Sequence, residues 1–119
     1  MSKVMLLLLL LSNDVVAKQT YLKCDIKGST VSIIIEDNAL DDNSGRVQHI
    51  DAHTSVKNIT ADITYEYIYY MYKVEDITRY MLINRFTLRI SKTEASESDD
   101  NISVSIGKCT VLRSEDRKV

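Results

Sequence analysis

The sequence predicts an all-β protein, a small antiparallel sandwich or barrel of about six or seven strands. Apolar residues recur at every second position along most of the chain, and β-branched and aromatic residues are abundant. Proline is absent, and only three glycines occur. A chain of 119 residues has room for one domain of the commonest size. Two cysteines stand near its ends, where one disulfide would join the first and last strands.

The strands follow one another at the spacing of hairpins, which favours an antiparallel sheet. Residues 94–101 are acidic and rich in serine, so we expect a solvated loop there, and residues 113–119 read as a charged tail. A second acidic run lies at 41–43, and neither run has the spacing of a calcium loop. The expected strands cover residues 20–25, 31–35, 46–54, 62–74, 77–83, 86–91 and 102–109.

Residues 62–74 form the longest expected strand. A helix is the alternative, because no helix-breaking residue lies between positions 61 and 76. The tyrosines, with isoleucine and threonine, are better suited to a strand. Alternation then places Tyr65, Tyr67 and Tyr69 on one face and Tyr70 and Tyr72 on the other.

Residues 1–17 read as a cleavable signal peptide, which leaves a single β domain over residues 18–119. The segment has a short positive start, an apolar run with six consecutive leucines, and a polar exit that ends at Ala17. The apolar run is too short to span a bilayer, so we expect no membrane attachment of the mature form. The alternative is the first core strand of an intracellular protein. The leader predicts a periplasmic or secreted location.

Export predicts that the two cysteines form a disulfide, because thiols pair in an oxidising compartment. A bond between Cys24 and Cys109 would close almost the whole domain into one loop, which restricts the unfolded chain. The competing reading is a reactive or metal-binding thiol pair. That reading lacks both C-x-x-C spacing and a histidine close in sequence to either cysteine.

Motifs at both ends of the chain resemble those of small uncharacterised exported proteins of proteobacteria. These proteins carry Y-L-x-C near the mature N-terminus, I-N/D-R-x-T-G before the last strands, and a C-terminal G-K-C. The corresponding residues here are 21–24, 83–87 and 107–109. Leu88 stands where those proteins usually have a turn glycine. The resemblance implies export and the disulfide, and no catalytic activity.

The histidines suggest one possible metal site. On a strand, His49, Asp51 and His53 share one face, which we expect to be the solvent side, with Ile50 and Ala52 turned inward. Two imidazoles and a carboxylate could bind zinc or a similar divalent ion. The alternative is a polar outer face that holds the two histidines. In that case, replacing both by Ala should change the free energy of unfolding by less than about 0.5 kcal/mol.

A second candidate site is an aromatic platform of Tyr65, Tyr67 and Tyr69 for a sugar or a peptide. Cross-strand aromatic packing is the alternative explanation. No catalytic residues, cofactor motif or basic patch for nucleic acid emerge from the sequence. The sequence therefore favours a non-catalytic binding or structural module with a protein partner in the cell envelope. The alternatives are a metal-binding protein or metal-dependent enzyme, and a small inhibitor of an envelope-targeting enzyme such as lysozyme.

Overall fold

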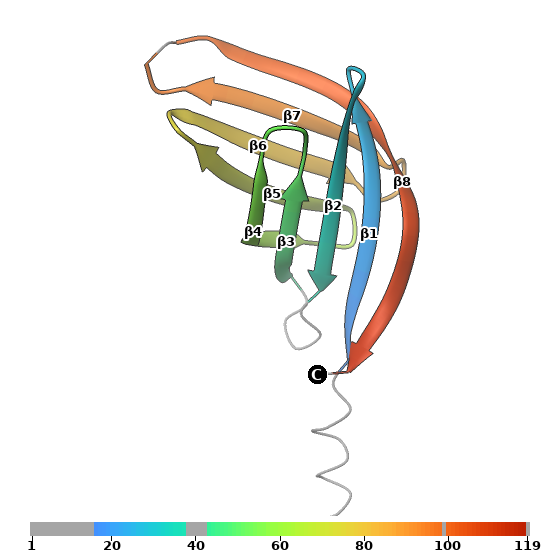
Figure 1. Cartoon of the computed structure of the whole chain (residues 1–119). Coiled ribbons are helices and arrows are strands. Elements are labelled where there is room, and N and C mark those ends of the chain that lie inside the picture. Colours follow the sequence, from blue (N-terminus) through green and yellow to red (C-terminus); the bar gives the residue numbers. More distant parts are fainter. Residues whose placement is uncertain (1–15, 38–42, 99, 119) are drawn as a thin grey trace, which may run out of the picture.

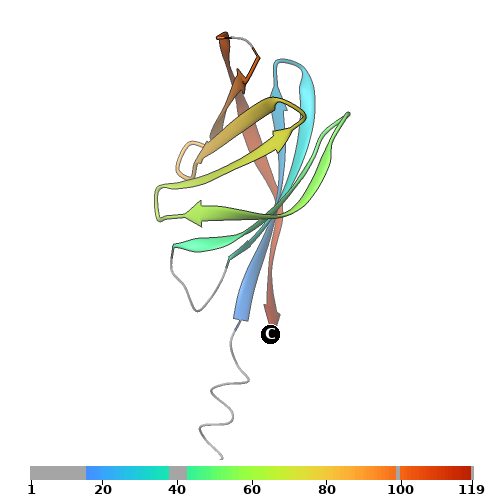
Figure 2. The ribbon, with the colours of Figure 1, turned by 90° about the vertical axis from the view of Figure 1, so that its left-hand side faces the viewer.

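The chain folds into eight antiparallel strands that close into a barrel, within the residues that the computed structural model describes, 16–37, 43–98 and 100–118. Figures 1 and 2 show the closed sheet from two sides. The all-β class is confirmed, and the expected six or seven strands are corrected to eight. They are β1 (Val16–Ile26), β2 (Ser29–Asp37), β3 (Ser44–Ile50), β4 (Ser55–Ile63), β5 (Tyr67–Val74), β6 (Ile77–Asn84), β7 (Arg89–Ser96) and β8 (Ile102–Lys118).

Each strand pairs with its neighbours along the chain, and β8 pairs with β1 to close the sheet. Cys24 lies opposite Cys109 in that pairing, and the two are disulfide-bonded, as the sequence predicts. Gly107 allows the two strands to approach closely, since a Cβ there would lie 2.0 Å from the backbone oxygen of Asp25. The disulfide and this glycine therefore both act on the β1–β8 pairing that closes the barrel, which we call the seam.

The prediction of one strand over residues 62–74 is wrong. β4 ends at Ile63 and β5 begins at Tyr67, so the segment is two antiparallel strands joined by a tight turn. The turn is held by Thr64, whose hydroxyl accepts hydrogen bonds from the amides of Glu66 and Tyr67. Threonine favours such turns more weakly than glycine, proline or asparagine does, so the local sequence gives little sign of the break.

β3 ends at Ile50 rather than near residue 54. The reason is Asp51, whose carboxylate oxygen Oδ1 accepts hydrogen bonds from the amides of His53 and Thr54, both at 2.9 Å. Aspartate often closes a turn in this way, because its short side chain reaches its own backbone two residues on. The β3–β4 hairpin therefore begins at the residue that the sequence assigned to a strand face.

The last two strands also run further than expected. β7 continues to Ser96, into the stretch expected to be a loop, since residues 94–96 pair with β6 and residues 94–95 also pair with β8. The backbone of β8 continues to Lys118 and pairs with β1 over residues expected to be a tail. Residues 94–96 of the expected loop and residues 113–118 of the expected charged tail are therefore strand.

The interior of the barrel is apolar, and it follows the predicted alternation on most strands. On β5, for example, Ile68, Tyr70 and Tyr72 are buried, whereas Tyr67 and Met71 are exposed. No buried side-chain nitrogen or oxygen lacks a hydrogen-bond partner in the described residues. The core comprises Leu22, Cys24, Ile26, Val31, Ile33, Ile35, Val47, Ile59, Ala61, Ile63, Ile68, Tyr70, Tyr72, Met81, Ile83, Ile90 and Cys109.

Leu88 occupies the position that is usually glycine in the proteins the sequence resembles. Its φ is 62°, in the left-handed region that glycine adopts without strain, so the tight β6–β7 hairpin forms although the residue is leucine. Its amide donates to the Asn84 carbonyl at 2.8 Å, and its side chain packs against the core. This packing offsets part of the backbone strain.

The predicted signal peptide lies outside the described residues except for its last two positions, and so does most of the acidic run at 41–43. In the described part of the chain, no helix is long and apolar enough to cross a membrane.

Candidate functional site

Two turns at one end of the barrel present aromatic side chains to solvent. Tyr65 in the β4–β5 turn is 81% exposed, and Phe86 in the β6–β7 turn is 63% exposed. Their rings meet edge to face with centroids 5.4 Å apart. We call Tyr65, Phe86 and the two turns that carry them the aromatic corner.

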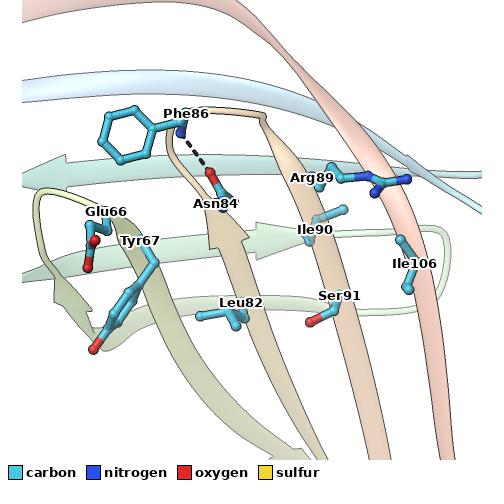
Figure 3. Close-up of a pocket in the computed structure, with 9 residues that line it drawn as sticks. All are labelled: Glu66, Tyr67, Leu82, Asn84, Phe86, Arg89, Ile90, Ser91 and Ile106. Carbon is cyan, nitrogen blue, oxygen red and sulfur yellow. Dashed lines mark hydrogen bonds between the residues drawn. The ribbon is translucent and has the colours of Figure 1, made fainter.

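Each turn is fixed by a side chain that precedes its aromatic residue. Thr64 holds the first turn through the two amide bonds described above. In the second turn, the Asn84 Oδ1 accepts a hydrogen bond from the amide of Phe86 at 2.8 Å (Figure 3). It accepts another from the amide of Thr87 at 3.0 Å. These local bonds fix the backbone where an exposed turn would otherwise be free to move.

Arg85 fastens the two turns to one another. Its amide donates to the Glu66 carbonyl at 2.9 Å, and its guanidinium donates to the Thr64 carbonyl. Two bonds from one residue therefore tie turns that lie about twenty positions apart in sequence. The aromatic corner is a preorganised surface rather than a pair of loose loops.

A groove of about 460 Å³ adjoins the corner on the outer surface of β5 to β8. Figure 3 shows its walls, with Tyr67 and Leu82 on one side and Ile106 on the other. Glu66 and Arg89 place opposite charges at its margins. The volume lies in the range of small-ligand pockets, about 300–1,000 Å³, and the exposed walls are mainly apolar.

The structure separates the three candidate tyrosines. Tyr65 lies on the corner, Tyr67 lines the groove and is 38% exposed, and Tyr69 is half-buried further along β5. They do not form one stacked platform, since Tyr65 lies in the turn. The aromatic partner of Tyr65 is Phe86, which the sequence interpretation did not single out. An aromatic residue two positions after the turn-forming Asn84 was the available signal.

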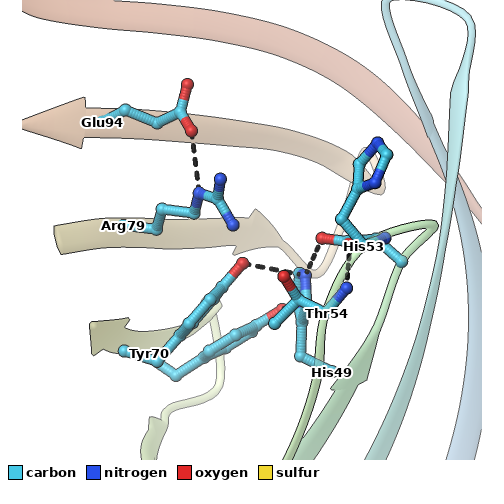
Figure 4. A network of polar contacts seen from close by, with 8 residues as sticks. His49, His53, Thr54, Tyr70, Arg79 and Glu94 are labelled. Atoms are coloured by element: carbon cyan, nitrogen blue, oxygen red, sulfur yellow. Dashed lines mark hydrogen bonds and ion pairs between the residues drawn. The ribbon is translucent and has the colours of Figure 1, made fainter. Parts of the chain in front are cut away.

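A second polar cluster lies inside the barrel, around His49 (Figure 4). This residue is 1% exposed, so its expected place on the solvent side is wrong, as is the inward place of Ala52, which is exposed. The inward positions of β3 are Gly45, Val47 and His49, in regular alternation. The sequence prediction placed the apolar Ile50 inward instead, but Ile50 is only half-buried.

Both ring nitrogens of His49 have partners. The Tyr70 hydroxyl lies 2.7 Å from Nδ1, and the Asp51 Oδ2 lies 3.1 Å from Nε2, with the Tyr72 hydroxyl at 2.9 Å. A carboxylate can only accept, so Nε2 carries a proton and donates to Asp51. If the ring is neutral, Nδ1 is then the atom that accepts a hydrogen bond from the Tyr70 hydroxyl. Arg79 and Glu94, paired at 2.7 Å, lie beside the cluster.

The electrostatics agree with a neutral histidine. Burial lowers the pKa of His49 below its ordinary value of 6.5, and the hydrogen bond and charge of Asp51 oppose this only in part. Burial acts to raise the pKa of Asp51, but hydrogen bonds from the His53 amide and from His49 outweigh it, so the net pKa lies below 3.8. Burial also raises the pKa of Tyr70 well above 10.0. The cluster thus holds one carboxylate and neutral rings.

The three residues of the expected metal site lie in or beside this cluster but do not converge. His49 contacts Asp51, whereas the exposed His53 meets Asp51 through its backbone amide, and its ring points away from His49 (Figure 4). Among the described residues, no group of three or more His, Cys, Asp or Glu side chains is placed to hold a metal ion. The observed role of Asp51 is to close a turn and orient a buried imidazole.

Taken together, the fold and its surface define a small disulfide-closed β-barrel with a rigid exposed aromatic corner. Comparison with known family models, with curated proteins and with solved structures finds no match for the chain.

Proposed function

We propose that this chain is an exported, non-catalytic binding module that docks on another protein through its aromatic corner. The observation that carries the proposal is the pair of exposed aromatic residues, Tyr65 and Phe86, on two turns that Arg85 fastens together. The leader predicted over residues 1–17 and the disulfide support a location in the cell envelope or outside the cell.

Exposed aromatic side chains on a rigid support are the usual anchors of protein interfaces. They offer large contact areas and lose little conformational freedom on binding, since only two side-chain angles become fixed. The corner also loses little backbone freedom, because Thr64, Asn84 and Arg85 already fix both turns.

Inhibition of an envelope enzyme is a specific form of this proposal. The observation that favours it is the position of both aromatic rings at the end of the barrel, where projecting side chains can enter a concave active site. Lysozyme turnover measured with increasing amounts of the protein tests this form. Inhibition that Phe86→Ala removes would support it, and unchanged turnover would exclude lysozyme as the target.

Site-specific photo-crosslinking tests the general proposal in the source organism. Benzoylphenylalanine placed at position 86 should give a covalent adduct with a discrete protein. The matched control is the same probe at position 57, an exposed site on the outer face of β4. Adducts at position 86 that are absent at position 57 support docking through the corner. No adduct at 86, or the same adducts at both positions, would contradict it.

A further inference from the structure

The outer face of β5 to β8 is unusually free of charge for a chain in which 27% of residues are charged. Three cross-strand rows cross these strands, and their outward positions are Tyr, Met, Leu, Thr, Ser, Ala, Ile and Val residues with one exception, Lys73 on β5, which pairs with Glu97 at 2.6 Å. Several are exposed, with Met71 at 48%, Leu82 at 43%, Val104 at 57% and Ile102 at 68%. We call these three rows the neutral face.

The polarity of this part of the barrel is reversed. On β6 and β7, the inward positions beyond the core carry Arg79, Lys92 and Glu94, and on β8 the buried inward residue is Ser105. The outward positions of the same strands are the more apolar ones. Contiguous apolar patches of a few hundred Å² on a monomer are often functional, and contact with another protein is one such function.

Charges frame the neutral face with opposite sign at its two ends. At one end, Arg89 on β7 lies directly opposite Lys108 on β8, with the acid Asp25 beside Lys108 on β1. At the other end, the β7–β8 turn carries the exposed acids Glu97 and Asp100, of which Glu97 pairs with Lys73 on β5 at 2.6 Å. The β7–β8 hairpin is therefore basic at one end and acidic at the other.

We infer that the neutral face packs against the same face of a second copy of this chain. A two-fold axis that runs across the strands places each strand antiparallel to its own copy, so the basic end of each hairpin lies over the acidic end of the other. Sheets commonly pack face to face in this way, with a small angle between their strands. The charges thus favour a second copy in one orientation, which is the self-complementary arrangement that closed dimers use.

This arrangement also gives the groove an occupant. The row of Met71, Tyr80 and Val104 lies on the axis. Ile102 lies one row away from the axis, on the side opposite the groove. The two-fold therefore places Ile102 of each copy over the groove end of the other copy's face. The corner residues Tyr65 and Phe86 lie in turns beyond the strand ends. The dimer would therefore carry two aromatic corners at opposite ends, which goes beyond the proposed function and does not depend on it.

The size of the face sets the expected strength. Four strands about 4.8 Å apart and roughly six residues long at about 3.4 Å each give a face of about 19 by 20 Å. That is about half of the roughly 800 Å² per partner of a standard interface, so the dimer belongs to the weak, concentration-dependent class.

Sedimentation equilibrium from about 10 µM to about 1 mM tests the dimer. Val104→Asp should lower the association constant at least about tenfold, because it places carboxylates on the axis. Lys57→Asp on β4 is the matched control and should leave the constant unchanged. A protein that stays monomeric throughout the range, or a Val104→Asp variant that associates like the wild type, would overturn the inference.

Two further variants test the orientation. Arg89→Glu and Asp100→Arg should each weaken association about threefold or more, and their combination should restore it, because Arg89 and Asp100 lie at opposite ends of the hairpin and come together only across the two-fold. If the combined variant associates as weakly as the single variants, this axis is wrong. A short bismaleimide should crosslink Val104→Cys dimers and leave Lys57→Cys monomeric. Equal crosslinking of both would likewise contradict it. Melting temperatures confirm that each variant folds.

Discussion

Acidification should weaken the barrel through the buried His49. His49 is buried and neutral, and burial lowers its pKa below 6.5, so the unfolded chain binds a proton more readily than the folded one. The stabilisation is complete above pH 6.5 and is lost as the pH falls from there through the lowered pKa of the folded state. Each pH unit in that window costs at most about 1.4 kcal/mol.

Removing the imidazole should cost more than the pH change. In His49→Ala, the hydroxyls of Tyr70 and Tyr72 lose the ring nitrogens that lie 2.7 and 2.9 Å away. A buried polar group left without a partner costs about 1–3 kcal/mol, and the cavity adds to this. We expect a loss of about 3 kcal/mol or more in the free energy of unfolding. The sequence alone predicted a loss of less than about 0.5 kcal/mol when both histidines are replaced by Ala, because it placed both rings on the solvent side.

Urea unfolding at about pH 7.5 and about pH 5 measures both effects. The wild type and His53→Ala should lose stability together on acidification, because His53 is exposed. His49→Phe keeps a ring in the cavity and removes the titrating group, so it should show a shallower loss over the same window. Equal pH dependence in wild type and His49→Phe, or a His49→Ala variant as stable as wild type, would refute the role assigned to this ring.

Other substitutions test the seam and the corner. Cys24→Ser opens a loop of 85 residues and should cost about 4–5 kcal/mol of unfolding free energy, seen as a much lower urea midpoint; an unchanged midpoint would remove the disulfide as a main stabiliser. Gly107→Ala brings a Cβ against the β1 backbone and should cost about 1–3 kcal/mol or prevent folding, whereas a melting temperature equal to wild type would show that the seam can relax. Phe86→Ala should change stability by less than about 0.5 kcal/mol, because the ring is mostly exposed, and a larger loss in thermal melts would give it a structural role.

The sequence was sufficient for the fold class because alternation is a repeated signal. On β5, six consecutive residues from 67 to 72 change sides in the predicted phase. The disulfide was equally accessible, since the mature chain expected after export contains two cysteines and admits one pairing. The predicted number of strands was too low because the turn at Thr64 was not recognised. The Thr64 hydroxyl holds this turn, and the segment has no glycine or proline to indicate it.

The candidate sites were harder to predict, because they depend on contacts between distant segments. The buried state of His49 rests on two tyrosines more than twenty positions away. An isolated reading of residues 49–53 has no access to them, and the apolar Ile50 suggested the opposite face. The aromatic corner likewise requires the β4–β5 and β6–β7 turns to lie side by side, which follows only from strand pairing.

The most direct test of the proposed function is the affinity of the corner for the protein captured at position 86. With that protein purified, calorimetry should show that Tyr65→Ala and Phe86→Ala together weaken binding by at least about 2 kcal/mol, or about thirtyfold. Lys57→Ala should bind like the wild type. Affinity within twofold of wild type in the folded double variant would contradict docking through the aromatic corner.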